Sequence, residues 1–172
     1  SKDSLTGLDN RREFIQVTQQ ALRSNDIEEP LSLIMFDLDN LKWINDNYGH
    51  QAGDWVLSEV GKILIARLAE STVSCARVGG EEFVLCLKGT EVNLALAYCN
   101  DIQSWLAGID TKAKLDGLQL SASFGVCDTN QVGKQLDSLI SGADLAMYKA
   151  KKAGRRQAVK YPMEQGSKEE SI

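Results

Sequence analysis

Two short acidic segments stand out in this sequence of 172 residues because each lies next to an apolar run. Asp37 and Asp39 come at the end of a strongly apolar stretch, and Glu81 and Glu82 lie at the tip of a predicted hairpin. A strand end and an adjacent hairpin turn can lie side by side in a sheet, where carboxylates repel one another unless a cation joins them. Ligands that are all oxygen favour Mg²⁺, which binds one or two carboxylates together with waters and substrate phosphates.

Each acidic segment also has a simpler interpretation. Asp39 could cap the helix that follows it, and Glu81 and Glu82 could form a solvated turn. Short motifs often match by chance, so for either segment alone the simpler interpretation is favoured. The two segments taken together favour a metal site.

The apolar patterns around these segments predict helices that alternate with strands. Apolar residues recur at the helical period in 10–23 and in 54–69, whereas 31–36 is a nearly continuous apolar run typical of a central strand. Trp43 and Trp55 are expected to pack rather than to stack on a ligand. The remaining elements are predicted as a helix at about 91–107, a strand at 118–126, a helix at about 135–153 that ends at Gly154, and an edge strand at 157–161.

The hairpin that carries the second acidic segment is predicted from two short apolar runs. Residues 75–78 and 83–87 would form its strands, and Gly79 and Gly80 would supply the positive φ of its turn. Phe83 is expected to anchor the hairpin in the core. Alternating helices with a hairpin between them predict a mixed sheet flanked by helices, an α+β or α/β layer fold.

Composition and charge exclude several classes of protein. Hydrophobic residues make up 43% and charged residues 25%, as in an ordinary globular domain, and no apolar run approaches the roughly 20 residues that cross a bilayer. The 24 acidic residues exceed the 19 basic ones, which argues against a nucleic-acid polymer as partner but permits a small phosphate ligand. The cysteines form no Cys-x-x-Cys pair, so reduced, buried thiols are expected rather than a zinc site. They are Cys75, Cys86, Cys99 and Cys127.

Five blocks of the sequence closely resemble the GGDEF family of diguanylate cyclases, in the same order and with the same spacing. The blocks are residues 3–12, 36–54, 77–83, 123–126 and 143–155. The third block contains Gly79-Gly80-Glu81-Glu82-Phe83, and the resemblance as a whole extends over about residues 3–160. Five blocks in order make a far more specific match than a lone glycine pair.

The resemblance implies an α+β, palm-like nucleotidyl cyclase fold, with a central, mainly antiparallel five-stranded sheet flanked by helices and the signature on a β-hairpin. It implies a catalytic domain over residues 1–161. The polar run at 164–171, which lacks apolar periodicity, separately predicts a flexible C-terminal tail at 162–172. The implied reaction condenses two GTP into cyclic di-3′,5′-GMP and releases two pyrophosphates. Each domain would hold one GTP, so a homodimer is needed for each 3′-hydroxyl to attack the α-phosphate of the other GTP.

The chain begins at the block where relatives of this family join a sensory or dimerising region. We therefore expect a catalytic output module of a signalling protein, separated here from an N-terminal sensory or dimerisation region. We expect the module to work in the cytoplasm, in a complete protein that can also carry a membrane anchor.

The resemblance also implies a set of metal ligands. The side chains of Asp37 and Glu81 and the backbone carbonyl of Leu38 would bind Mg²⁺ or Mn²⁺. Glu82 would bind a second metal or assist deprotonation of the 3′-hydroxyl, and Lys42 joins Glu81 and Glu82 in the implied catalytic set. The reaction needs metal ions because the attacking hydroxyl is a weak acid and negative charge builds on the α-phosphate.

The resemblance also implies that Asn45 and Asp54 bind guanine. A carboxylate accepts from the N1–H and the exocyclic amine of guanine, whereas adenine presents a ring acceptor, so this pairing disfavours ATP. The simpler interpretation of Asp54 is an N-cap for a helix that begins at Trp55, and that of Asn45 is an exposed polar position on a helix.

The implied phosphate ligands come from segments far apart in the sequence. Lys42, Lys151 and Arg155 would gather around the triphosphate, which explains how an acidic protein binds an anion. The loop that carries Asn40 and Leu41 would add backbone N–H groups at a helix N-terminus. Singly, each basic residue is more often plain surface charge.

Some positions depart from the family pattern. Glu81 stands where many relatives have Asp, and its extra methylene still permits Mg²⁺ ligation. Asn40 and Leu41 replace a more usual bulky or aromatic pair. Relatives inhibited by their product carry Arg-x-x-Asp shortly before the hairpin, but residues 70–73 contain neither of these charged groups at the matching positions. We therefore expect no tight binding of cyclic di-GMP there.

Two other functions stay open from the sequence. One is a non-catalytic nucleotide receptor, although degenerate family members usually lose hairpin residues that are present here. The other is related chemistry on ATP, which Asn45 and Asp54 disfavour. His50 is expected to be structural.

Overall fold

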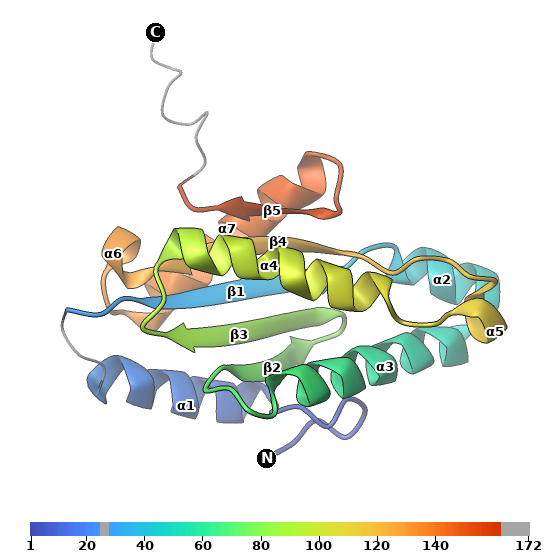
Figure 1. The fold of residues 1–172 in the computed structure, drawn as a ribbon, viewed down its shortest axis with the longest axis horizontal. Helices are drawn as coiled ribbons and strands as arrows, with labels where there is room; N and C mark the ends of the chain where they lie inside the picture. Colours follow the sequence, from blue (N-terminus) through green and yellow to red (C-terminus); the bar gives the residue numbers. More distant parts are fainter. Residues whose placement is uncertain (25–27, 163–172) are drawn as a thin grey trace, which may run out of the picture.

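The computed structural model describes residues 1–24 and 28–162, which form a five-stranded sheet covered by helices (Figure 1). The strands are β1 Leu31–Leu38, β2 Ser74–Gly79, β3 Glu82–Lys88, β4 Ala122–Asp128 and β5 Gln157–Lys160. They lie in the order β2-β3-β1-β4-β5, and all neighbours are antiparallel except the parallel pair β4 and β5. The mainly antiparallel five-stranded α+β fold is confirmed. Apart from Pro162, the predicted tail at 162–172 lies outside the described residues.

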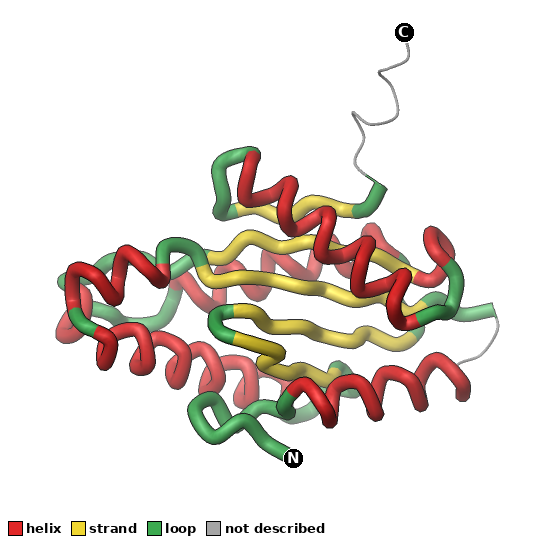
Figure 2. The backbone as a smooth tube through the Cα atoms, turned by 180° about the vertical axis from the view of Figure 1, so that it is seen from behind, coloured by secondary structure: helices red, strands yellow, loops and turns green. Residues whose placement is uncertain are grey.

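The long helices cover both faces of the sheet (Figures 1 and 2). One face packs against α3 His50–Leu68 and α4 Val92–Ala107, and the other packs against α1 Arg11–Ser24 and α7 Leu136–Lys152. Helix α2 Leu41–Tyr48 connects the end of β1 to α3. The sequence did not predict the two short helices α5 Lys112–Leu115 and α6 Thr129–Val132.

Strand β1 is central, and all of its residues are buried. Ile34, Phe36 and Leu38 belong to the core on the α3 and α4 face, whereas Met35 belongs to the core on the α1 and α7 face. Successive side chains of a strand point to opposite faces of the sheet. Asp37 therefore points toward the face that α1 and α7 cover.

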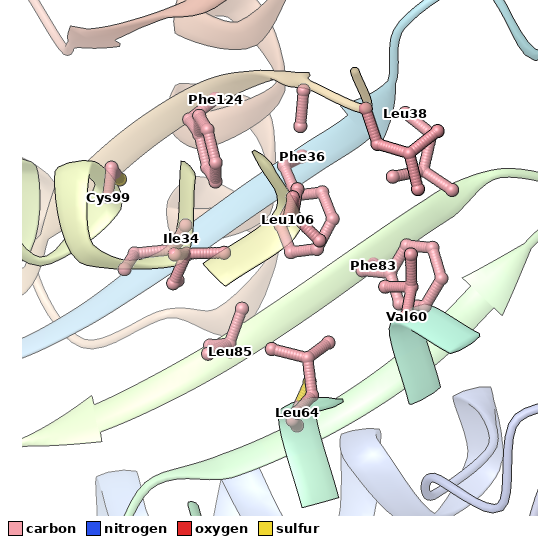
Figure 3. Close-up of a cluster of buried hydrophobic side chains, with 14 of the residues drawn as sticks. Ile34, Phe36, Leu38, Val60, Leu64, Phe83, Leu85, Cys99, Leu106 and Phe124 are labelled. Carbon is pink, nitrogen blue, oxygen red and sulfur yellow. The ribbon is translucent and has the colours of Figure 1, made fainter. Parts of the chain in front are cut away.

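Three phenylalanines, labelled in Figure 3, link the central strands β3, β1 and β4. Phe36 on β1 stacks on Phe83 of β3 with ring centroids 5.0 Å apart, and it contacts Phe124 of β4 at 5.1 Å. Such ring pairs stabilise a fold by about 0.5–1.5 kcal/mol each beyond the burial of their area. The prediction that Phe83 anchors the hairpin in the core is confirmed.

Helix α3 begins four residues earlier than the predicted start at 54. Gly49 ends α2 with a φ of 93°, and its N–H donates to the Asn45 carbonyl oxygen at 2.8 Å. The next helix then begins at once, at His50. The sequence prediction was wrong here because a single glycine separates two helices and no longer turn lies between them.

The strand predicted at 118–126 begins only at Ala122. The Leu118 carbonyl oxygen accepts from the Thr111 hydroxyl at 2.6 Å, and the Ala122 N–H donates to the Gln103 side chain at 2.8 Å. Leu120 is nevertheless buried. The apolar alternation of 118–121 therefore reflects contact with the core, and strand pairing starts after it.

Two smaller expectations were also wrong in part. Trp43 is 50% exposed, because α2 buries Leu41 and Ile44 and turns Trp43 outward, whereas Trp55 packs against the core as predicted. In the hairpin turn Gly80 has the positive φ, 39°, while the glycine before it ends β2 next to a β-bulge.

The four cysteines are free and buried, as predicted. Burial raises the pKa of the Cys86 thiol to about 11, which keeps it protonated. No helix in the described part of the chain combines the length and the apolar character needed to cross a membrane.

Candidate active site

The two acidic segments meet at one end of the sheet. Asp37 lies opposite Glu82 in the register of β1 and β3, and the Leu38 N–H donates to the Glu81 carbonyl oxygen at 3.2 Å. The prediction that a strand end and a hairpin tip lie side by side is confirmed.

Asp37 has one paired and one unpaired carboxylate oxygen. Its side chain is buried, with 8% of the residue exposed. Oδ2 accepts from the Nζ of Lys151 on α7, whereas Oδ1 is buried and has no hydrogen-bond partner among the described residues. Buried polar atoms are almost always paired, so Oδ1 marks a place where a cation or a donor can bind.

Burial and the nearby charge of Asp37 raise the pKa of Glu81 and of Glu82. For Glu81, burial is the largest cause and repulsion from Asp37 the next, while Lys151 and Arg155 oppose the shift. For Glu82, burial again comes first, followed by repulsion from Asp37 and from an acidic residue of α7. The Asp37 carboxylate thus contributes to the raised pKa of both glutamates, and a site with this much negative charge favours a bound cation.

The donors at this site fit Mg²⁺ or Mn²⁺. Asp37 supplies an unpaired oxygen, and Glu81 lies beside the backbone of Leu38. Within the described ranges, no group of three or more His, Cys, Asp or Glu side chains is arranged to hold a metal ion by itself. A cation would therefore also need backbone, water or phosphate oxygens, which is the coordination that Mg²⁺ usually has in nucleotide sites.

Eight of the predicted site residues line one open cavity of 330 Å³. They are Asp37, Leu38, Asn40, Leu41, Lys42, Glu81, Lys151 and Arg155. Trp43 and Asp46 of α2 complete the lining. Glu82 instead lines a neighbouring cavity beneath α1 and α7, together with Arg11 and Asp144.

The basic residues at the cavity come from two segments that are far apart in the sequence, α2 and the end of α7. Lys42 is exposed and pairs with Asp46 at 3.0 Å, an interaction worth no more than about 0.5 kcal/mol on a helix surface. Lys151 is near the end of α7, and Arg155 follows in a left-handed turn with a φ of 66°. Because its pair with Asp46 is weak, Lys42 can exchange that partner for a phosphate at little cost.

The N-terminus of α2 faces the same cavity. Asn40 precedes the helix with a φ of 62°, and its side chain makes no capping hydrogen bond within the described structure. The first N–H groups of a helix have no partner inside the helix and carry a partial positive charge. Such a terminus binds phosphate oxygens well.

The two residues predicted to read guanine lie on α2 and α3. Asn45 is half-buried, and its Oδ1 is buried without a hydrogen-bond partner in the part of the chain that is described. It contacts Gly53, the residue before Asp54. Asp54 is exposed inside α3, so the alternative that it caps a helix at Trp55 is wrong.

Asp39 has a role that the sequence did not reveal. It is 6% exposed and accepts from the hydroxyls of Ser121 and Ser123, both at 2.6 Å, and from the Arg156 N–H at 3.1 Å. It does not cap α2, so that interpretation is wrong. Asp39 ties the end of β1 to the start of β4 and to the turn that carries Arg155.

Arg77 connects the hairpin to the opening segment. Its Nε donates to the Gly80 carbonyl oxygen at 2.8 Å, and its Nη1 donates to Asp3 at 3.0 Å. Burial raises the pKa of the Asp3 carboxyl, but hydrogen bonds from Thr6 and the charge of Arg77 outweigh it, so the pKa is lowered overall. The opening segment thus holds the hairpin turn in place.

Comparison with known proteins places this α+β domain in a family. The family model described as "Diguanylate cyclase, GGDEF domain" matches residues 1–157. The chain is 36% identical over 154 residues to the diguanylate cyclase DgcS of Shewanella oneidensis, a match covering 89% of this chain and 50% of that protein. It is also 36% identical over 166 residues to the diguanylate cyclase DgcM of Escherichia coli, covering 91% and 37%.

Solved structures agree with these matches. The diguanylate cyclase SiaD of Pseudomonas aeruginosa, solved in complex with its activator SiaC, gives a TM-score of 0.83 at 31% identity over 92% of this chain and 61% of that one. The active GGEEF domain of a diguanylate cyclase from Vibrio cholerae gives a TM-score of 0.77 at 30% identity over 90% and 97%. The chain therefore belongs to the GGDEF family of diguanylate cyclase domains. It spans half or less of the length of the curated relatives described above.

Proposed function

We propose that residues 1–161 form a catalytic domain that condenses two GTP into cyclic di-3′,5′-GMP and two pyrophosphates. The observation that carries this proposal is the meeting of Asp37, Glu81 and Glu82 beside Lys151 at the end of the sheet. Acidic groups that can hold a cation, beside basic groups that can hold phosphates, are what nucleotidyl transfer needs.

The triphosphate binds in the open cavity between α2, the hairpin and α7. Lys42, Lys151, Arg155 and the N–H groups around Asn40 and Leu41 contact its oxygens. Lys151 must then leave the Asp37 carboxylate, with which it pairs in the structure. Because it is a cation on a flexible stem, it can move from that carboxylate to a phosphate, which would leave Asp37 free to bind a metal.

Asp37, Glu81 and the Leu38 carbonyl would hold one metal ion, and Glu82 would hold a second one or act on the 3′-hydroxyl. When bound, Mg²⁺ or Mn²⁺ supplies charge that activates the 3′-hydroxyl and stabilises the α-phosphate in the transition state. Glu82 assists removal of the 3′-hydroxyl proton, for which its raised pKa makes it a better base. Asn45 and Asp54 bind the guanine edge and discriminate against adenine.

Two copies of the domain face each other in the reaction, since each site holds one GTP. The sensory or dimerisation region that brings them together lies outside this chain, because relatives are at least twice as long as the stretch they share with it. The module acts in the cytoplasm, where GTP is available.

A dimer-forced fusion of the chain tests this proposal. We expect it to convert GTP to cyclic di-GMP when Mg²⁺ is present, and the Glu81→Ala and Glu82→Ala variants to lose that activity. GTP binding without any turnover after enforced dimerisation would instead indicate a non-catalytic nucleotide receptor. An equal yield of a cyclic product from ATP would remove the assigned roles of Asn45 and Asp54.

A further inference from the structure

Gly53 has no side chain, and the Asn45 side chain occupies the space that one would fill. A Cβ atom on Gly53 would lie 2.0 Å from Asn45 Oδ1 and 2.8 Å from its Cγ, closer than the 3.0 Å that such contacts require. Gly53 is buried inside α3 and its backbone is in the ordinary helical region. Glycine is less favourable than alanine inside a helix, so the backbone gives no reason for a glycine at this position.

Two other buried glycines, Gly61 and Gly125, have backbone atoms as their nearest neighbours. A Cβ atom on Gly61 would lie 2.3 Å from the backbone oxygen of Thr6, and one on Gly125 would lie 2.1 Å from the backbone oxygen of Ala143. Those glycines allow two stretches of backbone to pack closely. At Gly53 the neighbour is the end of a side chain, so a larger residue there would rotate Asn45 and leave the backbone in place.

The side-chain carbonyl oxygen of Asn45 lies against Gly53. Oδ1 is buried and lacks a hydrogen-bond partner within residues 1–24 and 28–162. It is an acceptor, and the acceptor of Asp54 follows Gly53 directly in α3. Guanine presents two adjacent donors, N1–H and the 2-amine, whereas hypoxanthine keeps N1–H and lacks the amine. Two acceptors therefore match guanine better than any base with one donor on that edge.

We infer that Gly53 is a positioning residue for base specificity, which holds the Asn45 acceptor beside Asp54 so that the domain requires the 2-amine of guanine. This inference rests on the proposed function, because it assumes that GTP binds between α2 and α3. It adds that specificity depends on a residue that cannot itself contact the base with a side chain.

A double-mutant cycle tests the inference on the chain as it stands. Binding of GTP and of ITP, which lacks the 2-amine, is measured by calorimetry with Mg²⁺ for the wild type, Gly53→Ala, Asn45→Ala and the double variant. We expect Gly53→Ala to weaken GTP binding about tenfold, as for the loss of one hydrogen bond, and to bring GTP and ITP close to equal affinity. In the Asn45→Ala background the same substitution should change neither affinity.

Gly108→Ala is the control, because a Cβ atom there lies 3.5 Å from its nearest neighbour, which is an ordinary contact. It should bind GTP as the wild type does. Unchanged GTP binding in Gly53→Ala, or an equal loss in both backgrounds, would overturn the inference.

Thermal unfolding of the same four proteins separates this inference from the proposed function. A wild-type domain that fails to bind GTP would refute the proposed function, and the unfolding midpoints would still decide whether Gly53 holds Asn45. We expect Gly53→Ala to raise the midpoint by about 2 °C or more in the Asn45→Ala background, through helix propensity, and by less or not at all in the wild type. Equal shifts in both backgrounds would show that the two residues are independent.

Discussion

Replacing Asp39 by alanine should destabilise the domain. Its buried carboxylate accepts from Ser121, Ser123 and the Arg156 N–H, and the substitution leaves all three donors without this acceptor. A hydrogen bond to a charged group contributes about 1.5–3 kcal/mol, and because such bonds are not additive we expect a total loss of about 3–5 kcal/mol. That is a large part of the roughly 5–15 kcal/mol that stabilises a typical domain.

The loss should lower the thermal unfolding midpoint on the order of 10 °C, measured by circular dichroism. Asp39→Asn keeps one acceptor and should lose about half as much stability. Glu59→Ala is the control, since it removes a carboxylate that pairs with an exposed lysine and should cost no more than about 1 kcal/mol. If Asp39→Ala unfolds within about 1 kcal/mol of the wild type, the idea that this carboxylate ties three segments together is wrong.

Three further outcomes follow from the site. Glu82→Gln should lower cyclic di-GMP formation by about 10²-fold or more while GTP binding stays close to wild type, and a fully active variant would exclude Glu82 from proton transfer. Because the folded-state pKa of Glu82 is raised, its ionised form destabilises the metal-free domain, so Glu82→Gln should exceed the wild type in unfolding free energy at pH 7. That difference should vanish as the pH falls below the usual glutamate pKa, and a difference that persists in acid would have another cause. Calorimetry should detect no tight cyclic di-GMP binding at 70–73, and sub-micromolar affinity there would contradict the expectation.

Features that depend on neighbouring residues could be predicted from the sequence. The apolar run of β1 and the hairpin around Glu81 and Glu82 are local patterns, and their meeting follows from the way strands pair. The start of α3 was missed because one glycine, Gly49, both ends a helix and precedes the next one. A local pattern predicts a second helix, but it does not show that a single residue connects α2 to α3.

Contacts between distant segments could not be predicted. The partners of Asp39 lie more than eighty positions away in the chain, and nothing near Asp39 distinguishes it from a helix cap. The fit of Asn45 against Gly53 depends on the angle between α2 and α3, which no periodicity specifies. The sequence predicted residues that gather around one cavity, whereas the contacts that hold them there are seen only in the fold.

The central position of β1 has a consequence for how the chain acquires its structure. Its neighbours β3 and β4 are both made after it, so β1 must wait with two open edges while much of the later sequence is synthesised. An apolar segment with unpaired edges is a ready template for aggregation, and pairing over such long sequence separations is slow. Destabilising changes in β3 or β4 should therefore lower the yield of folded protein in cells more than the equilibrium stability alone suggests.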